Sequence, residues 1–460
     1  MHHSHTFDET ILREYDIRGV VNETLNQNDA YVLGQLLGLL ILDAGGKNVC
    51  VGFDGRDSSP ILCERLTDGF VSVGIDVINI GCVPTPLLYF ASFFFKADAG
   101  VVITGSHNPP KYNGFKILLK NRPFFGKEIK KLGVTSQKYS YASKAGKKIF
   151  KSINDKYIQR ILKDFSGSEE LRVIWDPANG SGGEVISDLV KLLPGDHYVI
   201  NGDIDGSFPN HHPDPTNKDN LKQIIKEIKD KEADFGFAFD GDGDRLVVVD
   251  SNGNVLLGDQ LLFILSESVL KEHPGGTVVA DVKSSQILFD KIQSLGGTPI
   301  MYKTGHSNIK KKMLETRAVL GGEMSGHIFF ADKYYGYDDA IYTAIRFLSI
   351  FSSKSIKFDE TFSKIPKVIN TPEMRFYCDD KKKFHVVSDI GARLVNSGYQ
   401  IITIDGLRVT TPKGWWLLRA SNTEPALVAR CEAETLEDLN ELISFLSYEL
   451  SLKNIKLPVS

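Results

Sequence analysis

The strongest constraint on the fold is a pattern of strand, aspartate, polar loop and helix that recurs three times in the 460 residues. Apolar strands end at Asp54, Asp176 and Asp281, and each is followed by a polar loop and a helical stretch. In every copy a second short apolar strand comes next, and then a third strand. Regular alternation of strands and helices predicts α/β units with mixed sheets, and its recurrence indicates an internal triplication.

The C-terminal part of the chain has a different pattern. After about Thr371 the sequence predicts a strand over 374–377, an amphipathic helix over 382–396, several strands and a closing helix over 436–450. This order is typical of an α+β domain. We therefore predict three similar α/β units with mixed sheets, followed by a smaller α+β C-terminal domain. The predicted domains span residues 1–150, 151–252, 253–366 and 367–460.

The third strand of the first copy leads into the loop Thr104-Gly105-Ser106-His107-Asn108-Pro109-Pro110. The apolar run over 100–103 before it predicts a buried strand. Gly105 permits an unusual backbone conformation, and the two prolines stiffen the far end of the loop. The pattern predicts that Ser106 presents its hydroxyl at the end of a strand. Taken alone, however, the stretch is more typical of a polar turn that only reverses the chain.

A second loop, over 240–245, changes this interpretation because its three aspartates alternate with glycines. Oxygen-only ligands favour Mg²⁺ or Ca²⁺ over zinc. An EF-hand is excluded, since Arg245 and Ser251 stand where that motif requires Gly and Glu. Apolar strands flank the loop, so its carboxylates would repel one another strongly without a cation. A serine nucleophile and a carboxylate cage for a hard cation are the parts that phosphoryl transfer needs.

Two further loops carry polar side chains suited to a sugar phosphate. In the stretch over 322–327, Glu323 and Ser325 are able to accept and donate hydrogen bonds to neighbouring sugar hydroxyls. The loop over 419–423 combines a guanidinium, hydroxyls and an amide, which suits a phosphate dianion. Each loop alone also fits a capped turn. Because ligands collect beyond strand ends in α/β folds, three facing units would bring three of these loops to one cleft.

Composition excludes several other classes of protein. A net charge of -4 argues against a non-specific nucleic-acid binder. The most apolar stretch, over 31–42, is too short to span a bilayer, and no apolar signal core is present. We therefore expect a cytoplasmic protein without nucleic-acid or membrane partners. An odd number of widely spaced cysteines fits reduced thiols rather than a disulfide framework; they are Cys50, Cys63, Cys82, Cys378 and Cys431.

Taken together, the four loops at 104–110, 240–245, 322–327 and 419–425 resemble the signature loops of the α-D-phosphohexomutase family. They occur in the family's order, and the resemblance covers nearly the whole chain. Within the family, Gly-Glu-Met-Ser-Gly-His and Arg-Ala-Ser-Asn-Thr-Glu-Pro are similar to the phosphomannomutase/phosphoglucomutase branch. Phosphoglucosamine mutases carry a Ser-Gly-Thr version of the last loop, which makes that branch the weaker match.

The resemblance implies an isomerase that interconverts hexose 1-phosphate and hexose 6-phosphate, with mannose and/or glucose as the sugar. It implies a phosphoserine enzyme and a hexose 1,6-bisphosphate that serves as intermediate and activator. Catalytic roles are expected for Ser106, His107, Lys116, Arg18 and Arg245. Mg²⁺ is expected on an oxygen of phosphorylated Ser106 and on Asp240, Asp242 and Asp244. Substrate contacts are expected from Tyr15, Lys283, His306, Glu323, Ser325, His327, Arg419, Ser421, Asn422 and Thr423.

Several alternatives stay open at this point. A phosphoglucosamine mutase, a metal-dependent sugar phosphatase and a non-catalytic sugar-phosphate sensor would each use part of the same residues. The sequence does not rank mannose, glucose and glucosamine phosphates as substrates. Lys116 and His107 are the candidates for the general acid/base. We expect a monomer or a weak homo-oligomer that binds small-molecule hexose phosphates.

Overall fold

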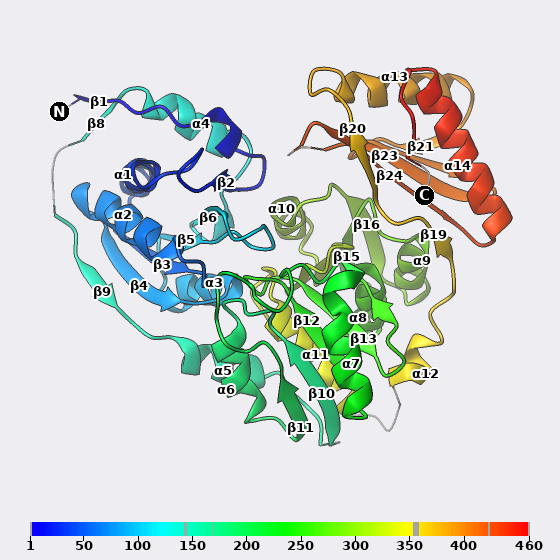
Figure 1. Ribbon diagram of the computed structural model, residues 1–460, viewed down its shortest axis with the longest axis horizontal. Coiled ribbons are helices and arrows are strands. Elements are labelled where there is room, and N and C mark those ends of the chain that lie inside the picture. Colours follow the sequence, from blue (N-terminus) through cyan, green and yellow to red (C-terminus); the bar gives the residue numbers. More distant parts are fainter. Residues whose placement is uncertain (1, 142–144, 169, 353–357, 422–423, 459–460) are drawn as a thin grey trace.

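The computed structural model describes residues 2–141, 145–168, 170–352, 358–421 and 424–458, and it contains four successive domains (Figure 1). Domains 1 to 3 each have a mixed sheet with helices, and domain 4 has an antiparallel sheet with two helices. The domains follow one another along an arc from the blue N-terminal part to the red C-terminal part (Figure 1). The predicted fold class is confirmed.

Domain 1 is built on a seven-stranded sheet in the order β2-β6-β5-β3-β4-β9, with β7 paired to β6. Its strands are β2 (Ile17–Val20), β3 (Asn48–Phe53), β4 (Asp76–Cys82), β5 (Ala99–Ile103), β6 (Tyr112–Leu119), β7 (Arg122–Pro123) and β9 (Lys148–Phe150). A separate pair joins β1 (His2–His3) to β8 (Tyr139–Ser140). The helices are η1 (Glu9–Ile11), α1 (Gln27–Asp43), α2 (Ser59–Ser72), α3 (Thr85–Phe94) and α4 (Lys127–Ser136).

Domain 2 has a five-stranded sheet in the order β11-β10-β12-β13-β14. Its strands are β10 (Leu171–Asp176), β11 (Gly195–Val199), β12 (Phe235–Phe239), β13 (Leu246–Asp250) and β14 (Val255–Leu256). Its helices are α5 (Asn154–Leu162), α6 (Gly183–Val190), η2 (Lys218–Leu221) and α7 (Lys222–Asp230).

Domain 3 has a four-stranded sheet in the order β16-β15-β17-β18. Its strands are β15 (Thr277–Asp281), β16 (Thr298–Tyr302), β17 (Leu320–Gly322) and β18 (Ile328–Phe330). Its helices are α8 (Gly258–Glu272), α9 (Gln286–Ser294), α10 (His306–Thr316), α11 (Ala340–Ser352) and α12 (Phe358–Phe362).

The three sheets repeat one arrangement. In each, the first strand lies between the second and the third and is parallel to both, and a fourth strand pairs antiparallel with the third. Because the connection from third to fourth strand is a hairpin, its loop projects from the same edge of every sheet. These three hairpins carry the loops predicted from the sequence. They are called the serine loop (104–110), the aspartate loop (240–245) and the glutamate loop (322–327) below.

Domain 4 differs in being wholly antiparallel, in the order β19-β24-β23-β22-β21, with β20 paired to β24. The strands are β19 (Ile369–Asn370), β20 (Met374–Tyr377), β21 (Gln400–Ile402), β22 (Leu407–Thr411), β23 (Gly414–Ala420) and β24 (Ala426–Ala433). Two amphipathic helices share a hydrophobic core with this sheet; they are α13 (Lys383–Asn396) and α14 (Leu436–Ser451).

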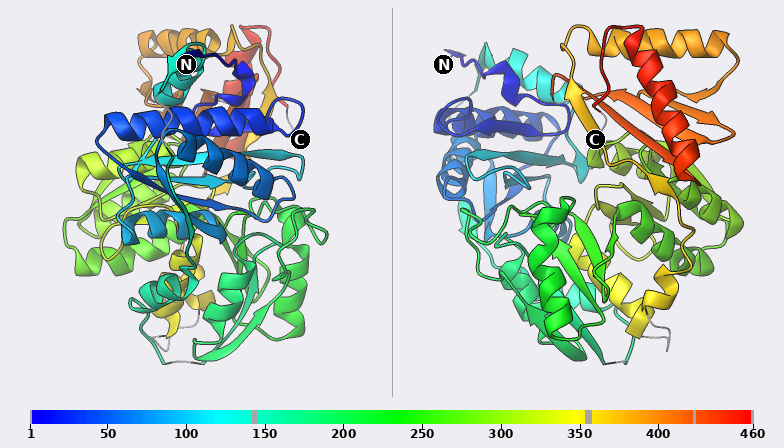
Figure 2. Two further views of the ribbon diagram at one scale, coloured as in Figure 1. Left: turned by 90° about the vertical axis from the view of Figure 1, so that its left-hand side faces the viewer. Right: turned by 45° about the vertical axis from the view of Figure 1, so that its right-hand side comes forward.

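Domains 1, 2 and 3 share a continuous hydrophobic core, in which Tyr89 of α3, Trp175 of β10 and Phe347 of α11 are all fully or almost fully buried. Domain 4 has a core of its own and lies next to domain 3 (Figure 2). The serine, aspartate and glutamate loops therefore belong to domains that share one hydrophobic core. The loop over 419–425 belongs to domain 4, which has its own core. Among the described helices, none is both long and apolar enough to cross a bilayer.

Candidate active site

The three hairpin loops contact one another. The Ser106 hydroxyl donates to Asp240 Oδ2 at 3.1 Å, and the two residues are only 3% and 1% exposed. The aspartate loop in turn meets the glutamate loop, because Arg245 Nε donates to His327 Nε2 at 3.1 Å. Ser106 has a φ of 49°, a left-handed conformation that is strained for a residue with a side chain. The fold thus brings the predicted nucleophile against a predicted metal ligand.

Two buried side chains that were not predicted as site residues hold the serine loop in this conformation. Asp54, at the end of β3, accepts the backbone N–H of Gly105 at 2.9 Å and the Nε–H of Arg56 at 3.1 Å. The Arg56 guanidinium donates to three backbone carbonyls of the loop, those of Ser106 (2.8 Å), Asn108 (2.6 Å) and Pro109 (2.7 Å), and to that of Tyr112 at the start of β6 (3.1 Å). Arg18, a predicted catalytic residue, donates to the Gly105 carbonyl. One arginine therefore fixes most of the loop backbone.

The aspartate loop gathers three buried carboxylates whose oxygens lie within 4.8 Å of one another, those of Asp240, Asp242 and Asp244. Lys116 Nζ lies 2.7 Å from Asp242 Oδ2 and also contacts Asp244 Oδ2. Thr85, at the start of α3, donates to the same Asp242 oxygen at 2.6 Å. The Oδ1 atoms of Asp242 and Asp244 are buried without a hydrogen bond to any described residue. Burial and the neighbouring carboxylates raise the pKa of Asp240 well above its ordinary value.

These residues fit a divalent cation. The three aspartates offer only oxygen ligands, and two of those oxygens are buried without a hydrogen bond in the described chain. The Lys116 ammonium pairs with Asp242 and Asp244, and His327 Nδ1 lies 3.6 Å from Asp244 Oδ1. Hard cations such as Mg²⁺ prefer this set of ligands. Lys116 and a bound cation would share these carboxylates, since each alone offsets only part of their charge.

A second buried polar cluster lies beside the aspartate loop and is centred on Asp338, which was not predicted. Its Oδ2 lies 3.1 Å from His327 Nδ1 and 3.4 Å from His306 Nδ1, and its Oδ1 lies 2.8 Å from Lys310 Nζ. Burial, followed by the charge of Lys310, lowers the pKa of His306 to about 4. His306 and His327 are thus oriented by one carboxylate rather than free in a loop.

His107 lies directly beside the serine hydroxyl, with Nδ1 3.3 Å from Ser106 Oγ. Burial, followed by the charges of Arg245 and Arg18, lowers the pKa of His107 well below its ordinary value. Lys116 behaves in the opposite way. Burial acts to lower its pKa, but the charges of Asp242 and Asp244 raise it above the ordinary value. Near neutral pH the imidazole is therefore neutral and the ammonium is charged.

The glutamate loop carries three predicted residues, of which Glu323 and His327 are buried and Ser325 is half-buried. Glu323 Oε1 accepts the backbone N–H of Gly305 at 2.6 Å, and burial is the largest cause that raises the pKa of this carboxyl. Ser325 is half-buried at the tip of the same hairpin. Tyr15 of domain 1 donates to the Thr304 carbonyl at 3.0 Å. A sugar between these groups would contact domains 1 and 3 together.

The predicted phosphate loop of domain 4 is only partly described. Arg419 is buried, and one of its terminal nitrogens lies 3.1 Å from Asp405 Oδ2. Ser421 is buried, and its hydroxyl accepts the backbone N–H of Glu424 at 3.2 Å. Lys283 of domain 3 lies 3.1 Å from Glu373 Oε2 of domain 4. The remaining predicted residues of this loop, Asn422 and Thr423, lie outside the described residues.

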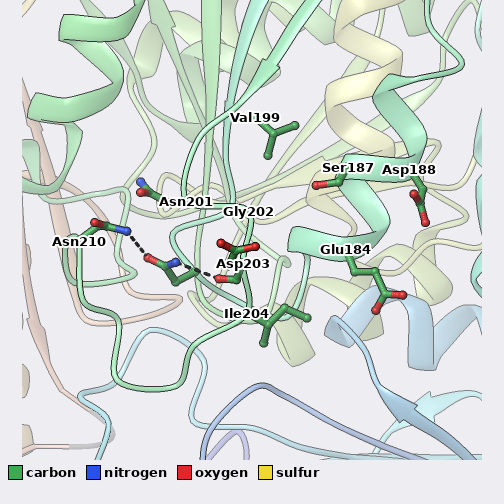
Figure 3. A pocket seen from close by; sticks show the side chains of 10 residues that line it. Glu184, Ser187, Asp188, Val199, Asn201, Gly202, Asp203, Ile204 and Asn210 are labelled. Atoms are coloured by element: carbon green, nitrogen blue, oxygen red, sulfur yellow. Dashed lines mark hydrogen bonds between the residues drawn. The ribbon is translucent and has the colours of Figure 1, made fainter.

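A hollow of about 720 Å³ lies elsewhere, in domain 2 (Figure 3). Amide and carboxylate side chains line it, among them Asn201, Asp203 and Glu184. The Asn210 amide donates to Asn179 Oδ1 at 2.9 Å at its rim. Within the described part of the chain, none of the predicted site residues lines this hollow.

Comparison with known families assigns all four domains. The chain matches the phosphoglucomutase/phosphomannomutase alpha/beta/alpha domains I, II and III over residues 9–141, 155–253 and 257–368. It matches the C-terminal domain of the same proteins over residues 373–446. The chain belongs to the phosphoglucomutase/phosphomannomutase family. The family prediction from the signature loops is confirmed.

Individual relatives agree with this assignment. A phosphomannomutase/phosphoglucomutase of Pseudomonas aeruginosa is 41% identical over 454 residues, which cover 99% of this chain and 98% of that protein. A solved family protein from Burkholderia thailandensis has a TM-score of 0.93 at 37% identity and covers 99% of this chain and 100% of its own. Such full-length similarity confirms the predicted enzyme class, an isomerase of the family.

A more distant structure shares the fold alone. It is an N-acetylphosphoglucosamine mutase of Aspergillus fumigatus in complex with GlcNAc-6P and magnesium. Its TM-score is 0.58 at 14% identity, and the match covers 92% of this chain and 96% of that one. In that protein the same fold holds GlcNAc-6P together with magnesium.

Proposed function

We propose that this protein interconverts hexose 1-phosphate and hexose 6-phosphate, of mannose and/or glucose, by passing a phosphoryl group through Ser106. The observation that carries the proposal is the 3.1 Å hydrogen bond from the Ser106 hydroxyl to Asp240, at the edge of a buried group of three carboxylates. A hard cation beside that serine would satisfy the buried carboxylate oxygens that lack a hydrogen bond to any described residue. Family membership and the four loops support the same reaction.

The cation is Mg²⁺ in this proposal, held by Asp240, Asp242, Asp244 and an oxygen of the phosphorylated Ser106. When bound, it would supply charge stabilisation for the phosphoryl oxygens. The chain's own contribution is positional. Arg56 and Asp54 fix the serine loop through backbone contacts, so the reacting oxygen is held in place before the substrate arrives.

Phosphoryl transfer then breaks the bond between phosphorus and Ser106 Oγ as a sugar hydroxyl oxygen bonds to phosphorus. Arg245, Lys116 and Arg18 offset the charge of the transferred group. The proton of the sugar hydroxyl needs an acceptor nearby. His107 is favoured over Lys116 for that role, because its imidazole is neutral whereas the Lys116 ammonium is held charged by two carboxylates.

The substrate end of the proposal has two parts. Glu323 and Ser325 bind sugar hydroxyls, assisted by Tyr15, His306 and His327. Arg419, Ser421, Asn422 and Thr423, with Lys283, bind the distal phosphate. A hexose 1,6-bisphosphate presents a phosphate at either end, so it fits the same site after it turns end for end. It is therefore both intermediate and activator, and hexose phosphates are the protein's proposed partners. We further propose a monomer or weak homo-oligomer acting in the cytoplasm.

A coupled assay tests the proposal directly. Purified protein is given Mg²⁺, glucose 1,6-bisphosphate and either mannose 1-phosphate, glucose 1-phosphate or glucosamine 1-phosphate. We expect the corresponding 6-phosphates from mannose and glucose and much less from glucosamine. Released inorganic phosphate in place of 6-phosphate would instead identify a sugar phosphatase, and binding without turnover would identify a sensor.

Ser106→Ala provides the decisive variant. We expect it to abolish turnover, because no covalent phosphoryl carrier is left. Mass spectrometry of the wild type should find one phosphate on the peptide that contains Ser106 after incubation with glucose 1,6-bisphosphate. Near-normal turnover by the variant would refute the phosphoserine route.

A further inference from the structure

Glu373 lies at the junction of domains 3 and 4 and faces the cations of the proposed phosphate site. It immediately precedes β20 and is 17% exposed at its side chain. Its Oε2 lies 3.1 Å from Lys283 Nζ across the domain junction, and its Oε1 accepts from Arg375 at 2.6 Å. The sequence offers no sign of this pairing, because Lys283 and Glu373 are far apart in the chain.

The surroundings of Glu373 keep it charged. Burial acts to raise its pKa, but the charges of Lys283 and Arg375, with a contribution from Arg419, lower the pKa to about 2. A full negative charge therefore stands among the same cations that would bind the distal phosphate of a sugar. The Lys283 ammonium is the ion partner of Glu373 Oε2 across the junction.

This arrangement opposes the binding of a dianion. A phosphate on Lys283 and Arg419 would lie close to the Glu373 carboxylate, and like charges a few ångströms apart repel strongly in a partly buried site. Two further carboxylates pair with these cations, since Asp405 Oδ2 lies 3.1 Å from Arg419 and Asp281 Oδ2 lies 3.9 Å from Lys283. A site selected only for tight phosphate binding would not place carboxylates beside its cations.

We propose that Glu373 competes with the distal phosphate of the substrate for Lys283, so that the site holds a sugar phosphate less tightly than its cations alone would allow. The inference rests on the proposed function and deepens it. A hexose 1,6-bisphosphate must release its distal phosphate and turn before the second transfer. Tight binding of both orientations would lower KM without speeding the reaction. Glu373 is thus a positioning residue that favours release.

The backbone of Lys283 does not depend on Glu373 for its place. Arg408 of β22 donates to the carbonyls of Val282 at 2.7 Å and Ser284 at 2.8 Å. Arg430 of β24 donates to the carbonyl of Lys283 itself. Figure 2 shows domain 4 lying against domain 3, where these contacts form. Removing the Glu373 charge should therefore leave the Lys283 ammonium with the more distant Asp281 carboxylate, 3.9 Å away, without displacing its loop.

The test is Glu373→Gln in the full-length protein, with glucose 1-phosphate as the probe. We expect isothermal titration calorimetry to give a Kd about tenfold lower than in the wild type, because one repulsive charge is removed. KM for glucose 1-phosphate should fall as well, and kcat should stay equal or fall because release is slower. Asp380→Asn is the matched control, since Asp380 is an exposed carboxylate of domain 4 that pairs with Lys383. Asp380→Asn should leave Kd, KM and kcat unchanged.

The direction in which the Kd for glucose 1-phosphate changes tests the inference. Unchanged or weaker binding by Glu373→Gln would overturn the inference, because it would mean that Glu373 helps to hold Lys283 for the phosphate. If Glu373→Gln does not fold, Glu373→Asp serves instead, since its shorter carboxylate withdraws from Lys283 and should give an intermediate Kd. Wild-type protein that neither binds nor isomerises glucose 1-phosphate would count against the proposed function. Normal wild-type turnover with no tightening in either variant would count against this inference alone.

Discussion

The two ends of the candidate site differ in the charges that cluster there. At the reacting end three carboxylates lie together: Asp242 and Asp244 pair with the Lys116 ammonium, and Asp240 Oδ2 lies 3.9 Å from Arg245 Nε. At the distal end the cations of Arg419 and Lys283 each lie within 3.1 Å of a carboxylate, and Arg375 joins them. Both ends are buried, where an unbalanced charge is costly.

This difference supports the ligands proposed for the two ends. A cluster of carboxylates suits a divalent cation, and a cluster of guanidinium and ammonium groups suits a phosphate. It also explains why two buried carboxyl groups in one site behave differently. Burial and like charges raise the pKa of Asp240, whereas Lys283 and Arg375 lower that of Glu373 despite its burial. Neighbouring charge, not burial alone, sets the protonation state.

The largest expected effect is at the reacting end, with Asp240→Asn. We expect turnover to fall by about 10³-fold or more, because the cation loses a charged ligand next to Ser106. In metal-free buffer the same variant should melt at a higher temperature than the wild type, since one of three repelling carboxylates is gone. Asp230→Asn, an exposed substitution in the same domain, is the control. A lower melting temperature for Asp240→Asn would contradict the charge balance described here.

Lys116→Met tests the reacting end by removing a cation instead of a carboxylate. We expect kcat to fall by about 10²-fold to 10³-fold, as when one charge-stabilising donor is removed from an active site. In metal-free buffer its melting temperature should fall, because no ammonium then offsets Asp242 and Asp244. Added Mg²⁺ should raise the melting temperature more in Lys116→Met than in the wild type, whereas exposed Lys138→Met should respond like the wild type. An equal response to Mg²⁺ would mean that Lys116 and the cation do not share these carboxylates.

At the distal end, Arg419→Lys should act on binding rather than on chemistry. We expect KM for glucose 1-phosphate to rise by about tenfold to 100-fold, because an ammonium cannot match the two-pronged contact of a guanidinium with phosphate. The value of kcat should change only several-fold. Steady-state kinetics at saturating glucose 1,6-bisphosphate separates the two constants. A loss confined to kcat would place Arg419 at the reacting end instead.

The order of the strands and the convergence of the loops could be predicted from the sequence. Apolar strands that end in Asp54, Asp176 and Asp281 mark the repeat, and each repeat needs only local signals to be recognised. The metal loop was accessible for a similar reason, since its three carboxylates lie within five residues. The predicted boundaries after residues 150, 252 and 366 stay predictions.

The residues that hold the site residues in place could not be predicted from the sequence, because their partners are distant in the chain. Arg56 acts on carbonyls about 50 residues away, and Asp338 orients His306 and His327 from the segment between β18 and α11. Glu373 meets Lys283 only after two domains have packed together. A lone arginine or aspartate in a loop carries no local pattern, so sequence reasoning finds reacting groups more readily than the groups that position them.

The smallest expected effect is a pH dependence that distinguishes the two ends. The pKa of Glu373 falls from an ordinary 4.5 to about 2 on folding, so its contribution to stability is fully present above pH 4.5 and is lost as the pH falls toward 2. Glu373→Gln should therefore be less stable than the wild type by about 1–3 kcal/mol at pH 6, and this difference in stability should narrow as the pH is lowered from 5 toward 3.

Asp240→Asn should instead be more stable than the wild type in metal-free buffer. Because the pKa of Asp240 is raised on folding, its ionisation costs stability at higher pH, and the advantage of the variant should grow as the pH rises. Melting temperatures of the three proteins across this range measure both trends, and parallel curves would show that neighbouring charges do not divide the site as described.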